Sequence, residues 1–124
     1  MSAKTALMSA LFDQFTSFLE ELRDMYPDDN DFPMFITSIK VLKNTNPVML
    51  TKYIYENTEK FGDKIMSKDE DFFLANNFEE YNGYVDMNLF GKLKTYVSTM
   101  SPSSKDSVWK YCQNIFRLAK ACQS

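Results

Sequence analysis

The carboxylates of residues 23–35, in the stretch RDMYPDDNDFPMF, are the first candidates for chemistry in this chain. Carboxylate oxygens are ligands that Ca²⁺ prefers, so the stretch can be tested against a 12-residue calcium loop. A loop that begins at Asp28 has Phe32 at its fifth position and Pro33 at its sixth, where glycine makes a sharp turn. Ile39 then occupies the twelfth position, where a bidentate glutamate is needed. The stretch therefore predicts no calcium site.

A second acidic segment begins at Asp69 and gives the same result. Asp71 and Glu80 fit the third and twelfth positions, but Phe73 and Leu74 occupy the fifth and sixth. We therefore expect no metal site in either segment. The aspartates of the first segment are explained better by an exposed loop between two helices, where negative side chains complement the positive start of the second helix.

Other catalytic groups are scarce in this sequence. Histidine is absent, which removes the commonest general base and the commonest metal ligand. Two cysteines cannot build a zinc site by themselves, and three scattered glycines form no phosphate-binding loop. Adjacent acids such as Glu20 and Glu21 diverge by about 100° on a helix, so they do not converge on one point. We predict a non-enzymatic protein with no catalytic, cofactor-binding or metal-binding residues.

The first segment predicts a long amphipathic helix from about residue 2 to residue 26. Its apolar residues recur at steps of three and four, which is the helical period. The helix should end before Pro27, because a residue ahead of proline avoids helical angles. The expected stripe consists of Leu7, Met8, Leu11, Phe12, Phe15, Phe18, Leu19, Leu22, Met25 and Tyr26.

Two further helices follow from helix-start signals. Asp31 is the expected N-cap of the second helix, and Pro33 then lies in its first turn, where a missing N–H does no harm. Asn46 and Pro47 begin a third helix by the same logic. Gly62 weakens or ends that third helix.

The second half of the chain predicts one short and two longer helices. Residues 67–70 read Ser-Lys-Asp-Glu, a capping-box pattern that predicts a short helix over residues 68–75. A helix is expected over about residues 86–100. Ser101 then caps the last helix, with Pro102 at its first position.

These elements predict an all-α fold: a compact, irregular bundle of about five main helices and one short helix. Period-two alternation never lasts beyond four residues, so strands find no support. The 124 residues, 44% hydrophobic and 25% charged, suit a single helical domain over residues 1–124.

Compartment signals favour a protein that is not secreted. If Cys112 and Cys122 share one helix, about 15 Å of rise separates them, so we expect reduced thiols, as in the cytoplasm or nucleus. Asp13 and the helical period argue against a signal peptide in the first segment. No run of 18 apolar residues suggests a membrane span.

Charge is distributed unevenly along the chain. Residues 1–90 hold 8 basic and 16 acidic side chains, a net charge of −8, whereas residues 91–124 hold 6 and 1, a net charge of +5. Together they give the net charge of −3, which disfavours general binding to nucleic acid. The basic end can instead meet an acidic partner or the acidic half of a second copy.

The candidate partner-binding residues combine aromatic rings with this basic end. Exposed rings supply buried area at an interface, and charges supply orientation. The residues that we expect to contact a partner are Tyr55, Trp109, Tyr111, Lys105, Lys110, Arg117 and Lys120.

Four stretches together resemble small helical proteins of the nucleocytoplasmic large DNA viruses, the relatives of phycodnaviruses and mimiviruses. They are FTSFLEELRDMYPDDNDFPMF, KNTNP, KIMSKDEDFFL and SPSSKDSVWKYCQNIFRLAKAC. The shared features are a phenylalanine-rich first helix before a Pro-Asp-Asp turn, a Lys-Asp-Glu-x-Phe-Phe segment, and a Ser-Pro-x-x-Lys opening ahead of Trp-Lys-Tyr. The likeness covers roughly residues 12–122. It implies a viral origin and an intracellular life in an infected host, and it transfers no active-site residue.

The leading functional hypothesis is therefore a non-enzymatic interaction or structural protein of a large DNA virus. It would act through exposed aromatic and basic helix faces on a viral or host protein, in the virion or in a viral factory of the host cytoplasm or nucleus. Self-association through the opposed charges is a further expectation. The alternative is a small nucleic-acid-associated factor that contacts the backbone with its basic C-terminal helix.

Overall fold

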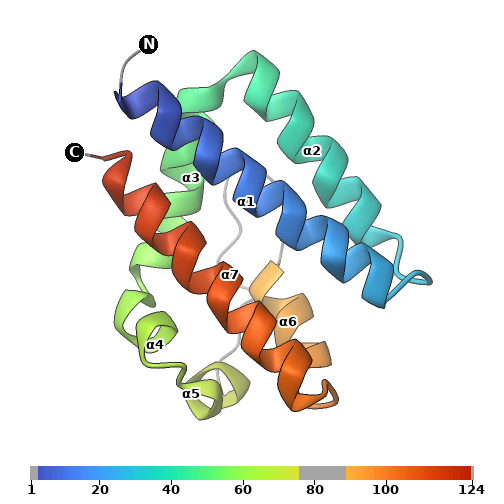
Figure 1. Ribbon diagram of the computed structural model, residues 1–124. Coiled ribbons are helices and arrows are strands. Elements are labelled where there is room, and N and C mark those ends of the chain that lie inside the picture. The colour runs from blue at the N-terminus through green and yellow to red at the C-terminus, as the bar shows by residue number, and fades with distance from the viewer. Residues whose placement is uncertain (1–2, 76–88, 124) are drawn as a thin grey trace.

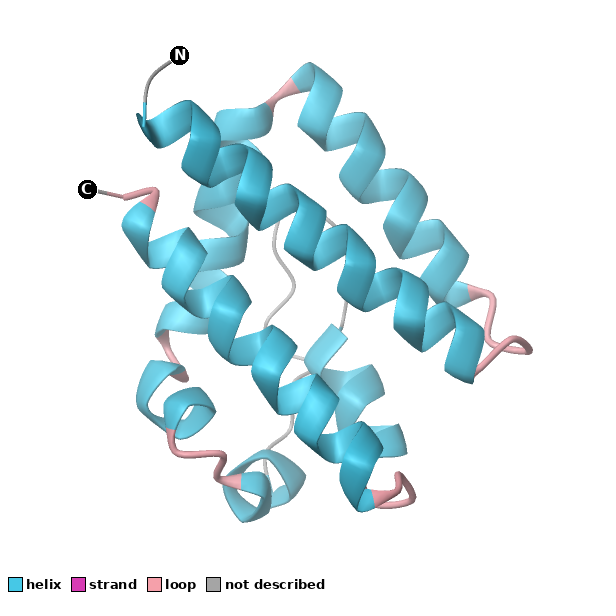
Figure 2. Ribbon diagram, in the orientation of Figure 1, coloured by secondary structure: helices cyan, strands magenta, loops and turns pink. Residues whose placement is uncertain are grey.

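The computed structural model describes residues 3–75 and 89–123, without the side chain of Phe90. Within these residues the chain forms seven helices and no strand, which confirms the all-α prediction (Figures 1 and 2). The helices are α1 Ala3–Met25, α2 Asp31–Thr45, α3 Pro47–Glu59, α4 Gly62–Met66, α5 Glu70–Ala75, α6 Leu89–Val97 and α7 Pro102–Ala121.

Four long helices surround the core. α1 packs along α2 on one side and α7 on the other, and α3 packs behind them against α7 and α2 (Figure 1). The short helices α4 and α5 lie beside the lower half of α7, and α6 lies near α5. None of the helices in the described part of the chain is both long enough and apolar enough to cross a bilayer.

The buried stripe of α1 follows the predicted pattern. Its inward residues are Leu11, Phe12, Phe15, Phe18, Leu19 and Leu22, each almost fully removed from water. Burial of such side chains contributes about 1.5–3 kcal/mol each, so this stripe supplies a large part of the core. Met25 is an exception, because it lies exposed at the end of the helix although the spacing assigned it to the stripe.

Two predicted helix starts are confirmed by their caps. The side-chain oxygen of Asn46 accepts a hydrogen bond from the backbone N–H of Met49 at 3.2 Å. The hydroxyl of Ser101 accepts one from the N–H of Ser104, also at 3.2 Å. In both helices a proline follows the cap, where its missing N–H removes no helical hydrogen bond.

The predicted N-cap of α2 is wrong by one residue. Asp31 is the first residue of the helix itself, and Asn30 stands at the N-cap without a side-chain hydrogen bond. Asp29, the residue before Asn30, caps the helix instead, because its Oδ1 accepts a hydrogen bond from the backbone N–H of Asp31 at 3.0 Å. An aspartate in the loop therefore replaces the expected cap.

The capping box expected at residues 67–70 is also wrong. The hydroxyl of Ser67 donates to the carbonyl oxygen of Lys64 and ends α4, a helix that was not predicted. Asp69 caps α5 instead, since its Oδ1 accepts the N–H of Phe72 at 3.1 Å. The described chain thus has two short helices, α4 and α5, where one was expected.

The helix expected over residues 86–100 is described as α6, Leu89–Val97. Residues 86–88 lie outside the described part of the chain. The helix ends before the predicted limit, and the N–H groups of Thr99 and Met100 close a turn on the carbonyls of Tyr96 and Val97. Met100 is buried after this turn, so it still joins the core.

Candidate functional site

An open groove of about 460 Å³ lies where the end of α3, the helix α4 and α7 meet. Half-buried rings line its inner part, and exposed charged side chains line its outer part. This volume lies in the range of ligand-binding clefts. The lining residues are Tyr55, Glu59, Lys60, Gly62, Asp63, Lys64, Phe72, Phe116 and Lys120. We refer to this feature as the α3–α4–α7 groove.

A close approach between α4 and α7 shapes the groove. A Cβ atom added to Gly62 would lie 2.6 Å from Cζ of Phe116, which is shorter than real Cβ contacts allow. Glycine is therefore needed here for lack of space, since no positive φ is found at any described glycine. At the other end of α4, the side-chain amide of Gln113 donates to the carbonyl oxygens of Ile65 and Met66 at 3.4 and 3.1 Å. α7 thus holds α4 at both ends.

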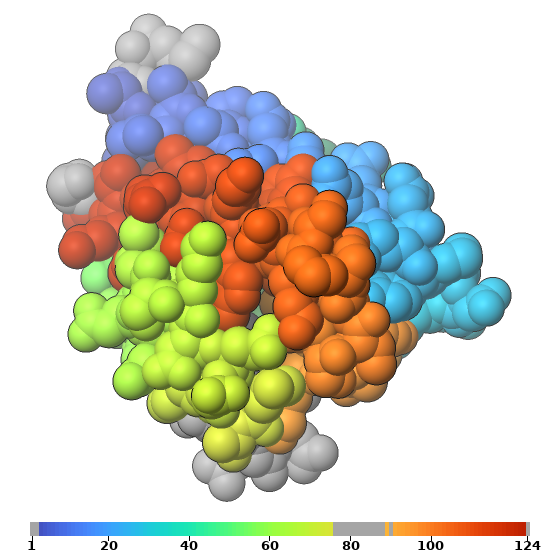
Figure 3. Space-filling model, turned by 60° about the horizontal axis from the view of Figure 1, so that its bottom comes forward, coloured from blue at the N-terminus to red at the C-terminus, as the bar shows by residue number. Residues whose placement is uncertain are grey.

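α5 completes the aromatic part of the groove. Phe72 lies 5.9 Å from Phe61, measured between ring centroids, and the ammonium group of Lys64 lies 5.3 Å from the centre of the Phe72 ring. The same ammonium forms an ion pair with Asp69 at 3.4 Å. Figure 3 shows the surface of α4 and α5, in yellow-green, joined to that of α7, in red and orange.

Charge in the groove is mixed, with a positive excess. Three lysines and two acids line it, so its net charge is +1. Lys120 is exposed and forms no ion pair with another described residue. Such a lysine can bind an incoming carboxylate or phosphate without first breaking a contact within the protein.

The predicted residues Lys110 and Arg117 lie on the outer face of α7, next to this groove. They are seven residues apart, which is two helical turns, and both are exposed. Arg117 donates to the side-chain oxygen of Asn114 at 3.4 Å, and within the described residues neither cation has an acidic partner. With Lys120, they form what we call the α7 basic face: Lys110, Arg117 and Lys120.

Trp109 and Lys105 mainly form contacts with other helices of the same protein. The indole of Trp109 is half-buried, lies 5.6 Å from the ring of Phe73, and lines a small apolar hollow of about 40 Å³ between α5, α6 and α7. Lys105 Nζ lies 3.2 Å from a carboxylate oxygen of Glu70 and so joins α7 to α5. Both residues were predicted to contact a partner, and within the protein both connect helices, so their role in binding stays a prediction.

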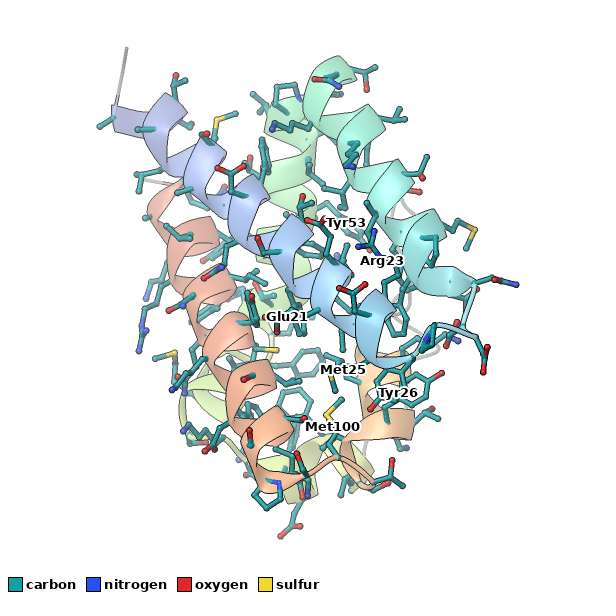
Figure 4. The ribbon with its side chains drawn as sticks, turned by 45° about the vertical axis from the view of Figure 1, so that its right-hand side comes forward. Glu21, Arg23, Met25, Tyr26, Tyr53 and Met100 are labelled. Carbon is teal, nitrogen blue, oxygen red and sulfur yellow. The ribbon has the colours of Figure 1, made fainter. Side chains whose placement is uncertain are left out.

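Tyr111 and Tyr55 are also half-buried, although exposed rings were expected. Tyr111 stacks on Phe18 with ring centroids 5.1 Å apart, and burial together with a hydrogen bond from its hydroxyl to Glu21 raises its pKa. Glu21 lies on the side of α1 that faces α7 (Figure 4). Tyr55 packs partly against the core and lines the α3–α4–α7 groove with Lys120. Of the predicted rings, Tyr55 therefore lines the groove, and its role in binding stays a prediction.

Seven residues of the groove were not among the predicted binding residues: Glu59, Lys60, Gly62, Asp63, Lys64, Phe72 and Phe116. Phe116 was not singled out in the sequence, and Gly62 was expected only to weaken or end the third helix. The sequence contains one signal that could have found the groove, a glycine followed closely by lysines and a phenylalanine pair. That signal becomes specific only when α7 is known to pass beside it.

The acidic loop between α1 and α2 is fastened to α6. Lys92 Nζ lies 2.9 Å from Oδ2 of Asp29 and 2.6 Å from Oδ2 of Asp31. The hydroxyl of Tyr96 donates to Oδ2 of Asp29 at 2.5 Å, and the Tyr96 ring stacks on Tyr26 with centroids 3.8 Å apart. Figure 4 shows Tyr26 beyond the end of α1, beside α6. We call these residues the loop clamp: Tyr26, Asp29, Asp31, Lys92 and Tyr96.

The loop clamp changes the pKa values of its members. Burial alone would raise the pKa of Asp29, but hydrogen bonds from Tyr96, Lys92 and the Asp31 N–H hold that pKa below its usual value. The bonds to Asp31 and Asp29 raise the pKa of Lys92, and the bond to Asp29 raises the pKa of Tyr96. The opening acidic stretch is thus a helix boundary held by an ion pair.

Metal-ligating and thiol groups give no second site. In residues 3–75 and 89–123, no cluster of three or more His, Cys, Asp or Glu side chains could hold a metal ion. Cys112 and Cys122 are both free thiols. Burial raises the pKa of Cys112 to about 12, so this thiol, which lines the apolar hollow, is a poor nucleophile at neutral pH.

Comparison with known proteins adds no relative. No family model matches the chain, and neither a curated protein nor a solved structure matches it.

Proposed function

We propose that this chain is a non-enzymatic interaction protein that binds an acidic segment of another protein along the α3–α4–α7 groove and the α7 basic face. The observation that carries the proposal is the meeting of Tyr55 and Lys120 in one open groove of about 460 Å³. Half-buried rings there can take an apolar side chain of the partner, and the lysines can pair with its carboxylates. Its positive excess continues onto Lys110 and Arg117.

The form of the groove favours a flexible acidic segment with one large apolar side chain. The apolar lining is confined to the inner part, between Tyr55, Phe72 and Phe116. Charged side chains surround this apolar part. The cations of the α7 basic face extend the charged surface along the helix, because Lys110 and Lys120 are ten residues apart, which is about 15 Å of helical rise. A partner segment whose apolar side chain enters the groove, and whose carboxylates pair with the cations of α7, contacts both parts of the surface.

The resemblance of the sequence to proteins of large DNA viruses supports a viral setting. On this proposal the partner is a viral or host protein of the virion or the viral factory, in the cytoplasm or nucleus of the host. Mass spectrometry of purified particles and of infected cells tests this assignment. Absence of the chain from infected cells of every such host would remove it.

A fluorescence anisotropy titration tests the groove. The probe is a labelled peptide of about ten residues, rich in glutamate, with a single phenylalanine at its centre. We expect micromolar binding that weakens as salt rises, because charge attraction is screened. Lys120→Glu should weaken binding by about tenfold or more, which is about 1.4 kcal/mol.

Lys4→Glu is the matched control, since it makes the same charge change at an exposed position of α1, outside the groove. It should leave binding of this peptide within about twofold of the wild type. Equal losses in the two variants would show that only net charge matters and would contradict the proposal. Absence of binding by the wild type would contradict it as well.

Nucleic-acid binding is the second candidate, and the α7 basic face is the observation that favours it. Its three exposed cations have no acidic partner among the described residues and could follow a phosphate backbone. The exposed side chain of Asp106 on the same helix counts against it. A gel shift with single-stranded DNA at two salt concentrations tests it, and only a shift that is lost at the higher salt supports it.

A further inference from the structure

α2 carries apolar side chains on two opposite faces. Its inner face is buried in the core through Phe32, Phe35, Ile36 and Ile39. On the outer face, Met34 and Val41 keep 52% and 53% of their surface exposed, and Val48, in the first turn of α3, keeps 62%. Met34 and Val41 are seven residues apart on α2, which is two helical turns, and Val48 follows the non-helical Asn46 that separates α2 from α3. A surface helix normally has one apolar face, and a helix that is apolar on both sides is typical of a covered position.

The residues between them add little polarity to this outer face. Thr37 donates its hydroxyl to the carbonyl oxygen of Pro33 at 3.0 Å, and Thr45 donates to that of Val41 at 2.8 Å. Covering the face would therefore leave neither hydroxyl without a hydrogen-bond partner, so the cost of removing water is low. We call the face the α2 stripe: Met34, Thr37, Val41, Thr45 and Val48.

The charged side chains of residues 32–55 are all positive, and the nearby Asp31 is already paired with Lys92. Residues 32–55 contain three lysines and no acidic side chain. Lys40, Lys43 and Lys52 are all exposed, and Lys40 directly precedes Val41 at the middle of the stripe. The outer face of α1 has the opposite character, because Asp13 and Asp24 are exposed there.

This charge pattern decides between a second copy and a different partner. Two copies that met through the α2 stripe about a two-fold axis would bring Lys40 of one toward Lys40 of the other, and like charges repel. The outer face of α1 in a second copy is acidic but offers charges where apolar contact is needed. An amphipathic helix with an apolar stripe and acidic flanks satisfies both the stripe and the lysines.

We propose that the α2 stripe binds an acidic amphipathic helix of another protein. Its apolar residues would cover Met34, Val41 and Val48, and its acids would pair with Lys40, which lies about 100° from Val41 around α2. From Met34 to Thr45 the stripe is about 17 Å long, so a partner helix of three turns is enough. In Figure 1, α2 lies at the opposite edge of the bundle from α4, so the stripe is separate from the α3–α4–α7 groove. A protein with both surfaces can connect two partners.

The test is an NMR titration of the ¹⁵N-labelled full chain with a synthetic helical peptide. The peptide has about 18 residues, with leucine at heptad a and d positions and glutamate beside them; a matched peptide has lysine in place of glutamate. We expect the acidic peptide to shift the backbone amides of residues 34–48. The lysine peptide should bind at least about tenfold more weakly, because its charges repel Lys40.

Val41→Glu should abolish the shifts, since it introduces a charge into the middle of the stripe. Ser17→Glu makes a comparable exposed change on α1 and should leave binding within about twofold. Circular dichroism of both variants would check that each remains folded.

Three results would overturn the proposal. Shifts confined to α4 and α7 would assign the peptide to the groove and would leave the α2 stripe without a ligand. Absence of shifts at millimolar peptide would remove the stripe as a binding surface. A concentration-dependent dimer in sedimentation, lost in Val41→Glu, would show that a second copy covers the stripe. Failure of this test leaves the groove proposal standing, because Lys120→Glu and Val41→Glu lie on different surfaces.

Discussion

The outer faces of α2 and α7 differ, although both helices bury an apolar face in the same core. α7 shows exposed cations to solvent, at Lys110, Arg117 and Lys120. α2 shows Met34 and Val41, each about half exposed. Exposed charge is the ordinary outer face of an amphipathic helix, whereas exposed aliphatic residues at a regular spacing are not.

This difference teaches which physical force each face can offer a partner. Contact with the α7 basic face depends on charge, so it should weaken with salt and mainly change association rates. Contact with the α2 stripe depends on buried apolar area, so salt should affect it less. The acidic loop shows a third case, in which Lys92 is charged but already forms ion pairs with Asp29 and Asp31.

The largest effect should come from the inner face of α2. Ile39→Ala removes a fully buried side chain and leaves a cavity, so we expect a loss of about 2–5 kcal/mol in the free energy of unfolding. Val41→Ala, two residues away on the outer face, should change it by less than about 0.5 kcal/mol. Urea denaturation followed by circular dichroism measures both. Equal losses would mean that α2 has no free outer face.

The contact between α4 and α7 should be nearly as sensitive. Gly62→Ala adds a methyl group 2.6 Å from the Phe116 ring, and we expect a loss of about 1–3 kcal/mol as the ring or the helix moves. Phe116→Leu should relieve most of this cost when the two changes are combined, since the ring atoms are gone. A double-mutant cycle by urea denaturation measures the coupling, and additive losses would contradict the close approach.

Breaking the loop clamp tests whether a lysine in an ion pair contributes more to stability than an exposed lysine without one. Lys92→Met leaves the carboxylate of Asp29, which is only 10% exposed, without its ion pair, so we expect a loss of about 1–3 kcal/mol. Lys110→Met, on the exposed face of α7, should stay within about 0.5 kcal/mol of the wild type. Thermal denaturation at neutral pH compares the two variants. A loss as large in Lys110→Met would erase the distinction.

The smallest effect should be a dependence of stability on acid pH. The folded protein holds the pKa of Asp29 below its unfolded value of about 3.9, so the ionised carboxylate stabilises the fold above that pH. This contribution should fade as the pH falls through the lower, folded value. Asp29→Asn should therefore lose less stability than the wild type between about pH 5 and pH 2. Parallel pH curves of unfolding would show that the clamp does not depend on this carboxylate.

The helices themselves are largely determined by the sequence. The three-and-four spacing of α1, the Asn46-Pro47 and Ser101-Pro102 starts, and the absence of alternation all depend on neighbours along the chain. Such local signals act through the backbone and the period of the helix, so they can be recognised before the fold is known. The failure of the calcium pattern at Pro33 is local in the same way.

Only the tertiary structure decided which side chains contact other helices and which remain exposed to solvent. Trp109, Tyr111 and Lys105 were predicted to contact a partner, and Phe73, Phe18 and Glu70 contact them from other helices. Lys92 reaches Asp29 across 63 residues of sequence, and Gly62 meets Phe116 across a similar gap. Helical periodicity tells which residues share a face, but it does not tell which helix that face will meet. Contacts between distant segments therefore made both the groove and the exposed stripe of α2.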